Sequence, residues 1–83
     1  WVQKHLDYPT VAAENGIEGT VFVRFVVDTD GSISNVSVVR GVDPSLDKEA
    51  VETIKGAPEW EPGKQRGQPV RVQFNIPIVF KLQ

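Results

Sequence analysis

The sequence predicts an α+β domain in which helices pack on one face of a three-stranded antiparallel sheet, in the order α-β-β-α-β. Three observations predict this class. Residues 20–27 are dense in β-branched and aromatic side chains, residues 70–82 place an apolar side chain at every second position, and residues 43–56 space apolar side chains as a helix does. With 83 residues, the chain has room for one such domain, spanning 1–83, and no second.

The composition excludes several classes of protein. The chain has 40% hydrophobic and 24% charged residues and a net charge of −2, as ordinary globular domains have, so neither a disordered chain nor a basic nucleic-acid-binding protein is indicated. It has no cysteine, which excludes disulfides, zinc ribbons and thiol nucleophiles. No apolar run approaches the ~18 residues of a membrane span, and nothing at the start resembles a signal peptide.

The beginning of the chain predicts two short helices. In residues 1–7, the apolar side chains of Val2 and Leu6 are four apart, on one face of a helix, and Trp1 is close enough to join them. This predicts a helix that ends near Asp7. Because residues 1–6 look like the tail of a helix, we expect that helix to begin upstream of Trp1 and the chain to be a fragment of a longer protein. Pro9 suits the first turn of a second helix, which the left-handed conformation available at Asn15-Gly16 ends.

The middle of the chain predicts a hairpin followed by a helix. Residues 20–27 form the first strand, the turn formers of 28–32 reverse the chain, and residues 33–40 return antiparallel. Asp43-Pro44 is typical of a helix N-terminus, and Gly56 is placed to end that helix. Residues 57–69 contain three prolines and two glycines, which predict a long loop without regular structure, and we expect its Trp60 to pack into the core.

The last strand, residues 70–82, carries the most informative signal. Pro77 cannot donate a hydrogen bond to a neighbouring strand, so this strand is predicted at an edge of the sheet with Pro77 facing outwards. A long edge strand is suited to pairing with another extended chain. Residues 62–83 carry four cations and no anion, which is compatible both with attraction of an acidic peptide and with protection against aggregation.

No constellation in the sequence indicates catalysis. His5 is the only histidine, and no serine lies near it in the sequence, so neither a triad nor a general base is suggested. Residues 28–32 begin like a calcium loop, but Val39 stands where the twelfth-position glutamate belongs. The glycines never form a phosphate-binding arrangement. We therefore expect no enzyme, no metal and no cofactor.

Several short motifs, in order and at the right spacing, make the chain resemble the TonB C-terminal domain family. The resemblance covers Tyr8 to Leu82, and the residues that carry it are Tyr8-Pro9, Ala13, Gly16-Ile17-Glu18-Gly19, Asp30-Gly31, Ile33, Asn35-Val36, Trp60, Pro62-Gly63 and the final alternating strand. The sequence variant, with Asn15-Gly16-Ile17-Glu18-Gly19 and Arg40-Gly41-Val42-Asp43-Pro44, resembles the version common in Bacteroidetes.

The resemblance implies a periplasmic, non-catalytic domain at the end of an energy transducer that a single N-terminal helix anchors in the inner membrane. Its partners would be TonB-dependent outer-membrane receptors, gripped by their TonB box, and motor proteins of the ExbB/ExbD type, reached through the part of the protein that precedes Trp1. The implied partner-binding residues are Arg71, Val72, Gln73, Phe74, Asn75, Ile76, Pro77 and Ile78 on the last strand, with His5, Leu6, Asp7, Tyr8 and Pro9 as a second contact.

Some alternatives remain open at this stage. Better-known members have a glutamine where this chain has His5, three residues before the Tyr-Pro pair, which puts the role of that position in doubt. Tyr8-Pro9 is equally well explained as a packed corner. The same domain also occurs on membrane sensors or peptidases that take part in signalling, and an isolated fragment with an open edge is able to form a strand-exchanged homodimer.

Overall fold

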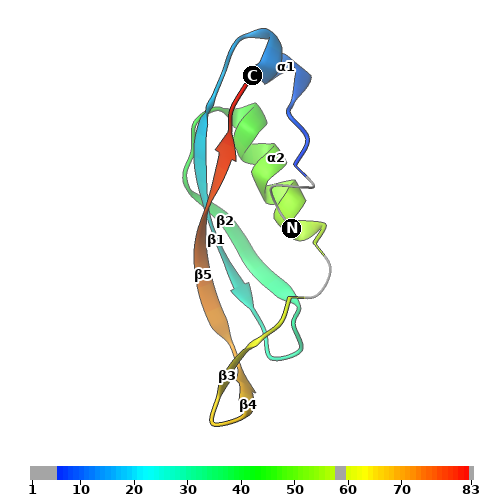
Figure 1. Cartoon of the computed structure of the whole chain (residues 1–83), viewed down its shortest axis with the longest axis vertical. Coiled ribbons are helices and arrows are strands. Elements are labelled where there is room, and N and C mark those ends of the chain that lie inside the picture. The colour runs from blue at the N-terminus through cyan, green and yellow to red at the C-terminus, as the bar shows by residue number, and fades with distance from the viewer. Residues whose placement is uncertain (1–5, 58–59, 83) are drawn as a thin grey trace.

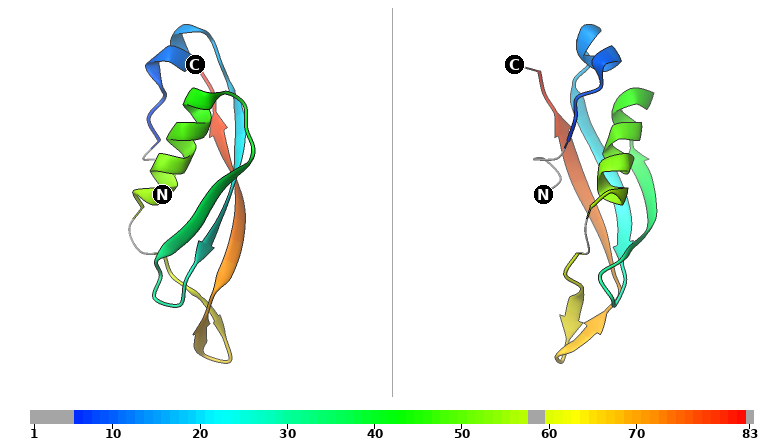
Figure 2. Two further views of the ribbon diagram at one scale, coloured as in Figure 1. Left: turned by 180° about the vertical axis from the view of Figure 1, so that it is seen from behind. Right: turned by 90° about the vertical axis from the view of Figure 1, so that its right-hand side faces the viewer.

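The computed structural model describes residues 6–57 and 60–82, and Figure 1 shows them as an elongated two-layer domain. A three-stranded antiparallel sheet has the order β2-β1-β5, and a separate two-stranded sheet pairs β3 with β4. Helix α2 lies across one face of the larger sheet (Figure 2). The elements are α1 (Thr10–Glu14), β1 (Gly19–Val27), β2 (Ile33–Arg40), α2 (Pro44–Lys55), β3 (Gly63–Gln65), β4 (Gln68–Val70) and β5 (Val72–Phe80).

The predicted fold class is confirmed, together with the hairpin and the long helix. Strand β2 has the predicted bounds, and β1 begins one residue earlier than predicted. Gly31, with φ +86°, supplies the positive φ that the turn between them needs. Asp43 caps α2 by accepting a hydrogen bond from the N–H of Ser45 at 3.0 Å, and Pro44 occupies the first turn, as the sequence predicts.

The prediction for the beginning of the chain needs correction. Residues 1–5 of the predicted first helix lie outside the described residues, and Leu6 and Asp7 have no regular secondary structure. The second helix is real but starts at Thr10, with Pro9 as its N-cap. Because Pro9 has φ −58° and ψ 131°, it is in an extended conformation and not in the first helical turn.

Residues 57–69 do not form a structureless loop, and the last strand is not continuous over 70–82. Strands β3 and β4 pair as a short hairpin that projects beyond the main sheet (Figure 1). Its turn residues Arg66 and Gly67 have φ +54° and φ +77°, which is the two-residue turn whose twist suits a hairpin. Since Arg71 interrupts the ladder between β4 and β5, the final strand is Val72–Phe80.

The core lies between α2 and the inner face of the large sheet. Phe25, near the end of β1, is fully buried, and its ring centroid lies 5.0 Å from that of Trp60 and 5.7 Å from that of Phe74. The N–H of Trp60 donates to the carbonyl oxygen of Gly31 at 2.9 Å, so the segment carrying Trp60 is tied to the β1–β2 turn. The expectation that Trp60 packs on the core is confirmed. The fully or almost fully buried residues are Ala12, Val21, Val23, Phe25, Val27, Leu46, Ala50, Ile54, Ile78 and Phe80.

Candidate partner-binding edge

Strand β5 forms an edge of the sheet, as Pro77 predicts. It pairs with β1 in unbroken antiparallel register over nine residues, with Pro77 level with Phe22. From Val72 to Ile78, nothing in residues 6–57 and 60–82 pairs with the other side of β5. This side of β5 is the place where the sheet could accept another strand.

Two hydrogen bonds at the ends of the sheet establish which backbone groups of β5 face outwards. The N–H of Asp28, which directly follows β1, donates to the carbonyl oxygen of Ser32 at 2.8 Å, on the β2 side. Backbone groups alternate along a strand, so the even-numbered residues of β1 direct their N–H groups to β2 and the odd-numbered ones to β5. Consistently, the N–H of Leu82 turns towards the β1 side and donates to Glu18 Oε1 at 3.1 Å.

The same alternation in β5 directs the even-numbered residues to β1 and the odd-numbered ones away from it. Gln73 and Asn75 therefore present both N–H and C=O groups outwards, and Pro77 presents a C=O group only. We call these two donors and three acceptors the outer edge of β5. Pro77 costs the β1–β5 ladder no hydrogen bond, because its missing N–H lies on the outer side.

The side chains of β5 divide between two environments. Val72, Phe74, Ile76 and Ile78 point to the side covered by α2, where Ile78 is fully buried and Phe74 and Ile76 are half-buried against the core. Gln73, Asn75 and Pro77 point to the opposite side and are exposed. A strand added at the outer edge would therefore place alternate side chains beside the half-buried rim of the core.

Residues Leu6 to Pro9 do not join this edge. Leu6 packs against the core, and the N–H of Asp7 donates to Glu49 Oε2 of α2 at 3.1 Å. The Tyr8 hydroxyl donates to the carbonyl oxygen of Ile17, while its ring meets Phe80 edge-on with centroids 5.6 Å apart. Tyr8 is thus a packed corner at the far end of β5. His5 lies outside the described residues, and the described part of the second predicted contact region, residues 6–9, packs against the core, α2 and Phe80.

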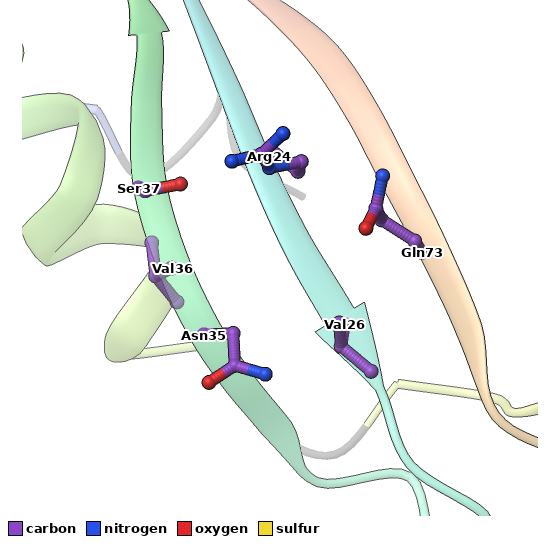
Figure 3. Close-up of a pocket in the computed structure, with 6 residues that line it drawn as sticks. All are labelled: Arg24, Val26, Asn35, Val36, Ser37 and Gln73. Atoms are coloured by element: carbon purple, nitrogen blue, oxygen red, sulfur yellow. The ribbon is translucent and has the colours of Figure 1, made fainter.

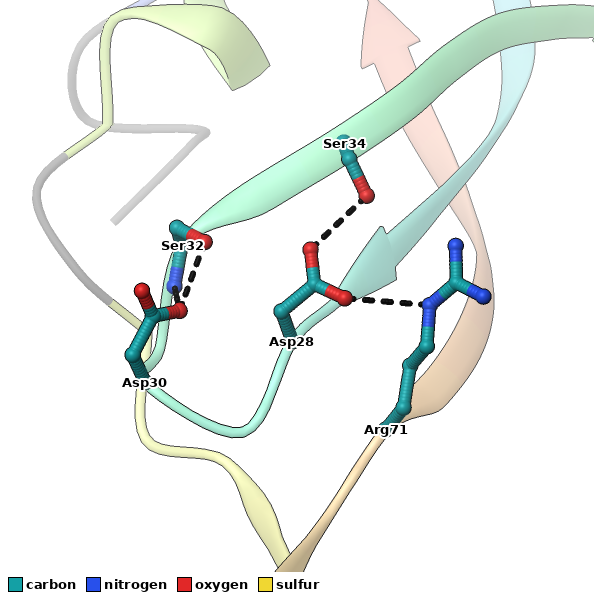
Figure 4. Close-up of polar contacts among 5 residues, drawn as sticks. All are labelled: Asp28, Asp30, Ser32, Ser34 and Arg71. Atoms are coloured by element: carbon teal, nitrogen blue, oxygen red, sulfur yellow. Dashed lines mark hydrogen bonds and ion pairs between the residues drawn. The ribbon is translucent and has the colours of Figure 1, made fainter.

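The start of β5 is held by a polar cluster (Figure 4). Arg71 Nε lies 3.0 Å from Asp28 Oδ1, and the Ser34 hydroxyl donates to Asp28 Oδ2 at 2.9 Å. The neighbouring Asp30 accepts hydrogen bonds from the hydroxyl and the N–H of Ser32, which lower the pKa of its carboxyl below the usual value. Arg71, a predicted partner-binding residue, is therefore engaged within the domain.

Tyr8 gives a direct test of the packed corner, because it is the only tyrosine in the chain. Removal of its hydroxyl from water, and secondarily the charge of Glu18, raise its pKa above the ordinary 10.0. We expect the tyrosinate absorbance of the folded domain to appear at higher pH than that of the urea-unfolded chain. Since the folded pKa is the higher one, stability is retained below pH 10 and lost as the pH rises through the folded value.

Replacement of Tyr8 by phenylalanine keeps the ring on Phe80 and removes the titrating group. The stability of this variant should then fall less steeply at alkaline pH, because the part of the decline that comes from ionisation of Tyr8 is gone. Identical tyrosinate midpoints in the folded and unfolded chains would show that the hydroxyl is not held in the corner.

The described residues contain no group of three or more side chains arranged to bind a metal. Among the same residues, no helix combines the length and the apolar character required to cross a membrane.

Comparisons of the sequence with known proteins agree on one family. The family model described as "Gram-negative bacterial TonB protein C-terminal" matches residues 4–82. The chain is 35% identical over 77 residues to Protein TonB of Helicobacter pylori, covering 92% of this chain and 26% of that protein. It is 37% identical over 79 residues to Protein TonB of Vibrio cholerae, covering 92% of this chain and 31% of that protein. The chain thus spans under a third of the length of these curated relatives.

Comparison with solved structures leads to the same family. The NMR structure of the TonB C-terminal domain of Helicobacter pylori, residues 179–285 of that protein, superposes with a TM-score of 0.81 at 33% identity, covering 99% of this chain and 74% of that one. A shorter version, residues 194–285, gives a TM-score of 0.76 at 32% identity, covering 96% of this chain and 84% of that one.

Proposed function

Because the chain belongs to the TonB C-terminal domain family, we propose that it is the receptor-binding domain of a TonB-type energy transducer. In this proposal the domain lies in the periplasm and pairs β5 with the TonB box, a short extended segment of an outer-membrane receptor. The similarity to proteins named TonB favours a transducer over a sensor or peptidase with a TonB-like tail.

The observation that supports receptor pairing is the outer edge of β5. It offers two N–H donors and three C=O acceptors along one side of the strand, beside half-buried apolar side chains. An extended peptide that pairs with such an edge gains affinity from backbone hydrogen bonds and specificity from alternate side chains. This mode of binding suits a partner that is recognised mainly as an extended strand.

The proposed mechanism transmits force and involves no catalysis. Motor proteins of the ExbB/ExbD type, driven by the proton gradient, would act on the N-terminal part of the full-length protein, anchored in the inner membrane. The paired strand would carry the pull to the receptor, opening it for active uptake. Each backbone hydrogen bond contributes only about 1 kcal/mol at equilibrium, but several loaded together resist a pull jointly.

The test is a backbone NMR titration of the domain with TonB-box peptides from receptors of the same organism. We expect the amide signals of β5, above all those of Gln73 and Asn75, to shift. In the variant Asn75→Pro, which removes one outward N–H, binding should weaken about 5- to 10-fold, as expected for one lost hydrogen bond.

Asn75→Ala is the matched control, because it removes the same side chain and keeps the N–H group. It should bind within about twofold of the unmodified domain, as expected when no backbone hydrogen bond is lost. Receptor peptides that leave the β5 amides unmoved at millimolar concentration, or an Asn75→Pro variant that binds as tightly as Asn75→Ala, would count against the proposal.

A further inference from the structure

The face of the large sheet opposite α2 is not covered by any described element, and its side chains form a surface that the proposed function does not yet use (Figure 2). We call it the open face. It exposes apolar groups, with Phe22 38% and Val39 57% exposed. It is hollowed by a shallow depression of about 370 Å³ beside Arg24 and Gln73, and by another of about 260 Å³ beside Phe22 and Asn75.

Figure 3 shows that Arg24 stands on the central strand, with Gln73 diagonally opposite on β5, at the border of the first depression. Within residues 6–57 and 60–82, the one ion pair is that of Arg71 with Asp28, so Arg24 has no carboxylate partner there. A second cation, Arg40, lies on the same face in β2. In a chain whose net charge is −2, this face is therefore locally cationic.

The register places Arg24 in reach of a strand at the outer edge of β5. Arg24 is level with Asn75, and both side chains belong to the open face. A partner residue level with Asn75 would lie two strand spacings, about 10 Å, from the Arg24 backbone. An extended arginine and a glutamate together span about that distance, passing over the short Asn75 side chain.

We propose that Arg24 is a specificity-determining residue, which reads an acidic side chain on the extended segment bound at β5, at the position level with Asn75. This inference rests on the proposed pairing at β5 and adds the chemistry of the partner. Residues of the bound strand alternate between the two faces, so apolar ones lie beside Phe74 and Ile76, and the acidic one lies on the open face.

Arg40 provides a matched comparison. It is level with Phe22 and Pro77, and it belongs to β2, so a partner strand beyond β5 lies three spacings, about 14 Å, from its backbone. The bulky Phe22 stands between them. The charge of Arg40 contributes to the electrostatic potential of the open face, but Arg40 cannot form a direct ion pair with the bound strand.

The experiment takes the receptor peptide that shifts the β5 amides and compares glutamate with glutamine at each of its positions in turn. We expect one position on the open-face side to favour glutamate by about 3- to 5-fold, which is the size of an exposed charge pair. The preference should vanish in Arg24→Gln, persist in Arg40→Gln, and weaken with added salt.

The outcomes separate the two proposals. If the β5 amides shift but no position shows a glutamate preference that depends on Arg24, the inference about Arg24 is wrong and the pairing at β5 stands. If Arg40→Gln removes the preference as fully as Arg24→Gln, the effect is the general potential of the face and the inference is again wrong. If no receptor peptide shifts β5, the proposed function fails and the inference with it.

Discussion

Replacement of Phe25 by alanine should cost about 3–5 kcal/mol of the free energy of unfolding, the usual range for a buried phenylalanine. Phe25 is fully buried near the end of β1, and its ring contacts the rings of both Trp60 and Phe74. Both of these rings would lose their contact with Phe25 at once, and a cavity would remain in the core. A domain of this size has only about 4–12 kcal/mol of stability, so much of the total is lost.

Phe22→Ala is the matched control for Phe25→Ala. It makes the same chemical change on the same strand, but on the open face, where the ring is 38% exposed. Urea unfolding followed by circular dichroism should give a smaller loss, of about 1–2 kcal/mol, since Phe22 is already partly exposed to water. Equal losses for the two variants would contradict the placement of the core on the α2 side of β1.

Replacement of Ile76 by proline should unfold the domain or cost about 3 kcal/mol or more, even though Pro77 is tolerated at the next position. Ile76 is level with the fully buried Val23 and directs its N–H group to β1. The substitution removes a hydrogen bond inside the ladder and leaves a buried carbonyl group without a donor. It also truncates a side chain that packs against the core.

Asn75→Pro is the counterpart, because it moves the same substitution by one residue to an outward-facing N–H group. Its amide spectrum should keep the dispersion of the folded domain, while that of Ile76→Pro collapses. If the two variants were equally folded, the assignment of inward and outward groups along β5 would be wrong. The pair also explains why a loss of peptide binding in Ile76→Pro carries no information about the outer edge.

Much of the fold could be predicted because its signals are local. Asp43-Pro44 starts α2 through hydrogen bonds within one helical turn, and Gly31 permits the turn between β1 and β2 by its own backbone freedom. The position of β5 at an edge is also local, because Pro77 excludes a central place by lacking one N–H. These features depend on a few neighbouring residues, which the sequence contains.

The hairpin of β3 and β4 could not be predicted in this way. Proline and glycine counts over 57–69 favour a loop, yet Pro69 pairs level with Lys64 in a ladder, and Arg66 adopts a positive φ that a glycine usually takes. Short strands gain little stability from their own sequence, so their pairing depends on the surrounding chain. Because β3 and β4 have only three residues each, they contain too few residues to show the alternation that predicts a strand.

The sequence by itself determined the fold class, the family and the strand that carries the candidate site, because periodicity, caps and a single proline act over short distances. Only the tertiary structure decided that Tyr8 is a packed corner, that Arg71 is paired with Asp28, and that Arg24 is level with Asn75. The first two depend on how segments outside the strands pack, and the third is the register between two strands far apart in the chain. Register depends on which side chains of each strand are buried on the α2 side, so it is settled only when strands far apart in the chain come together.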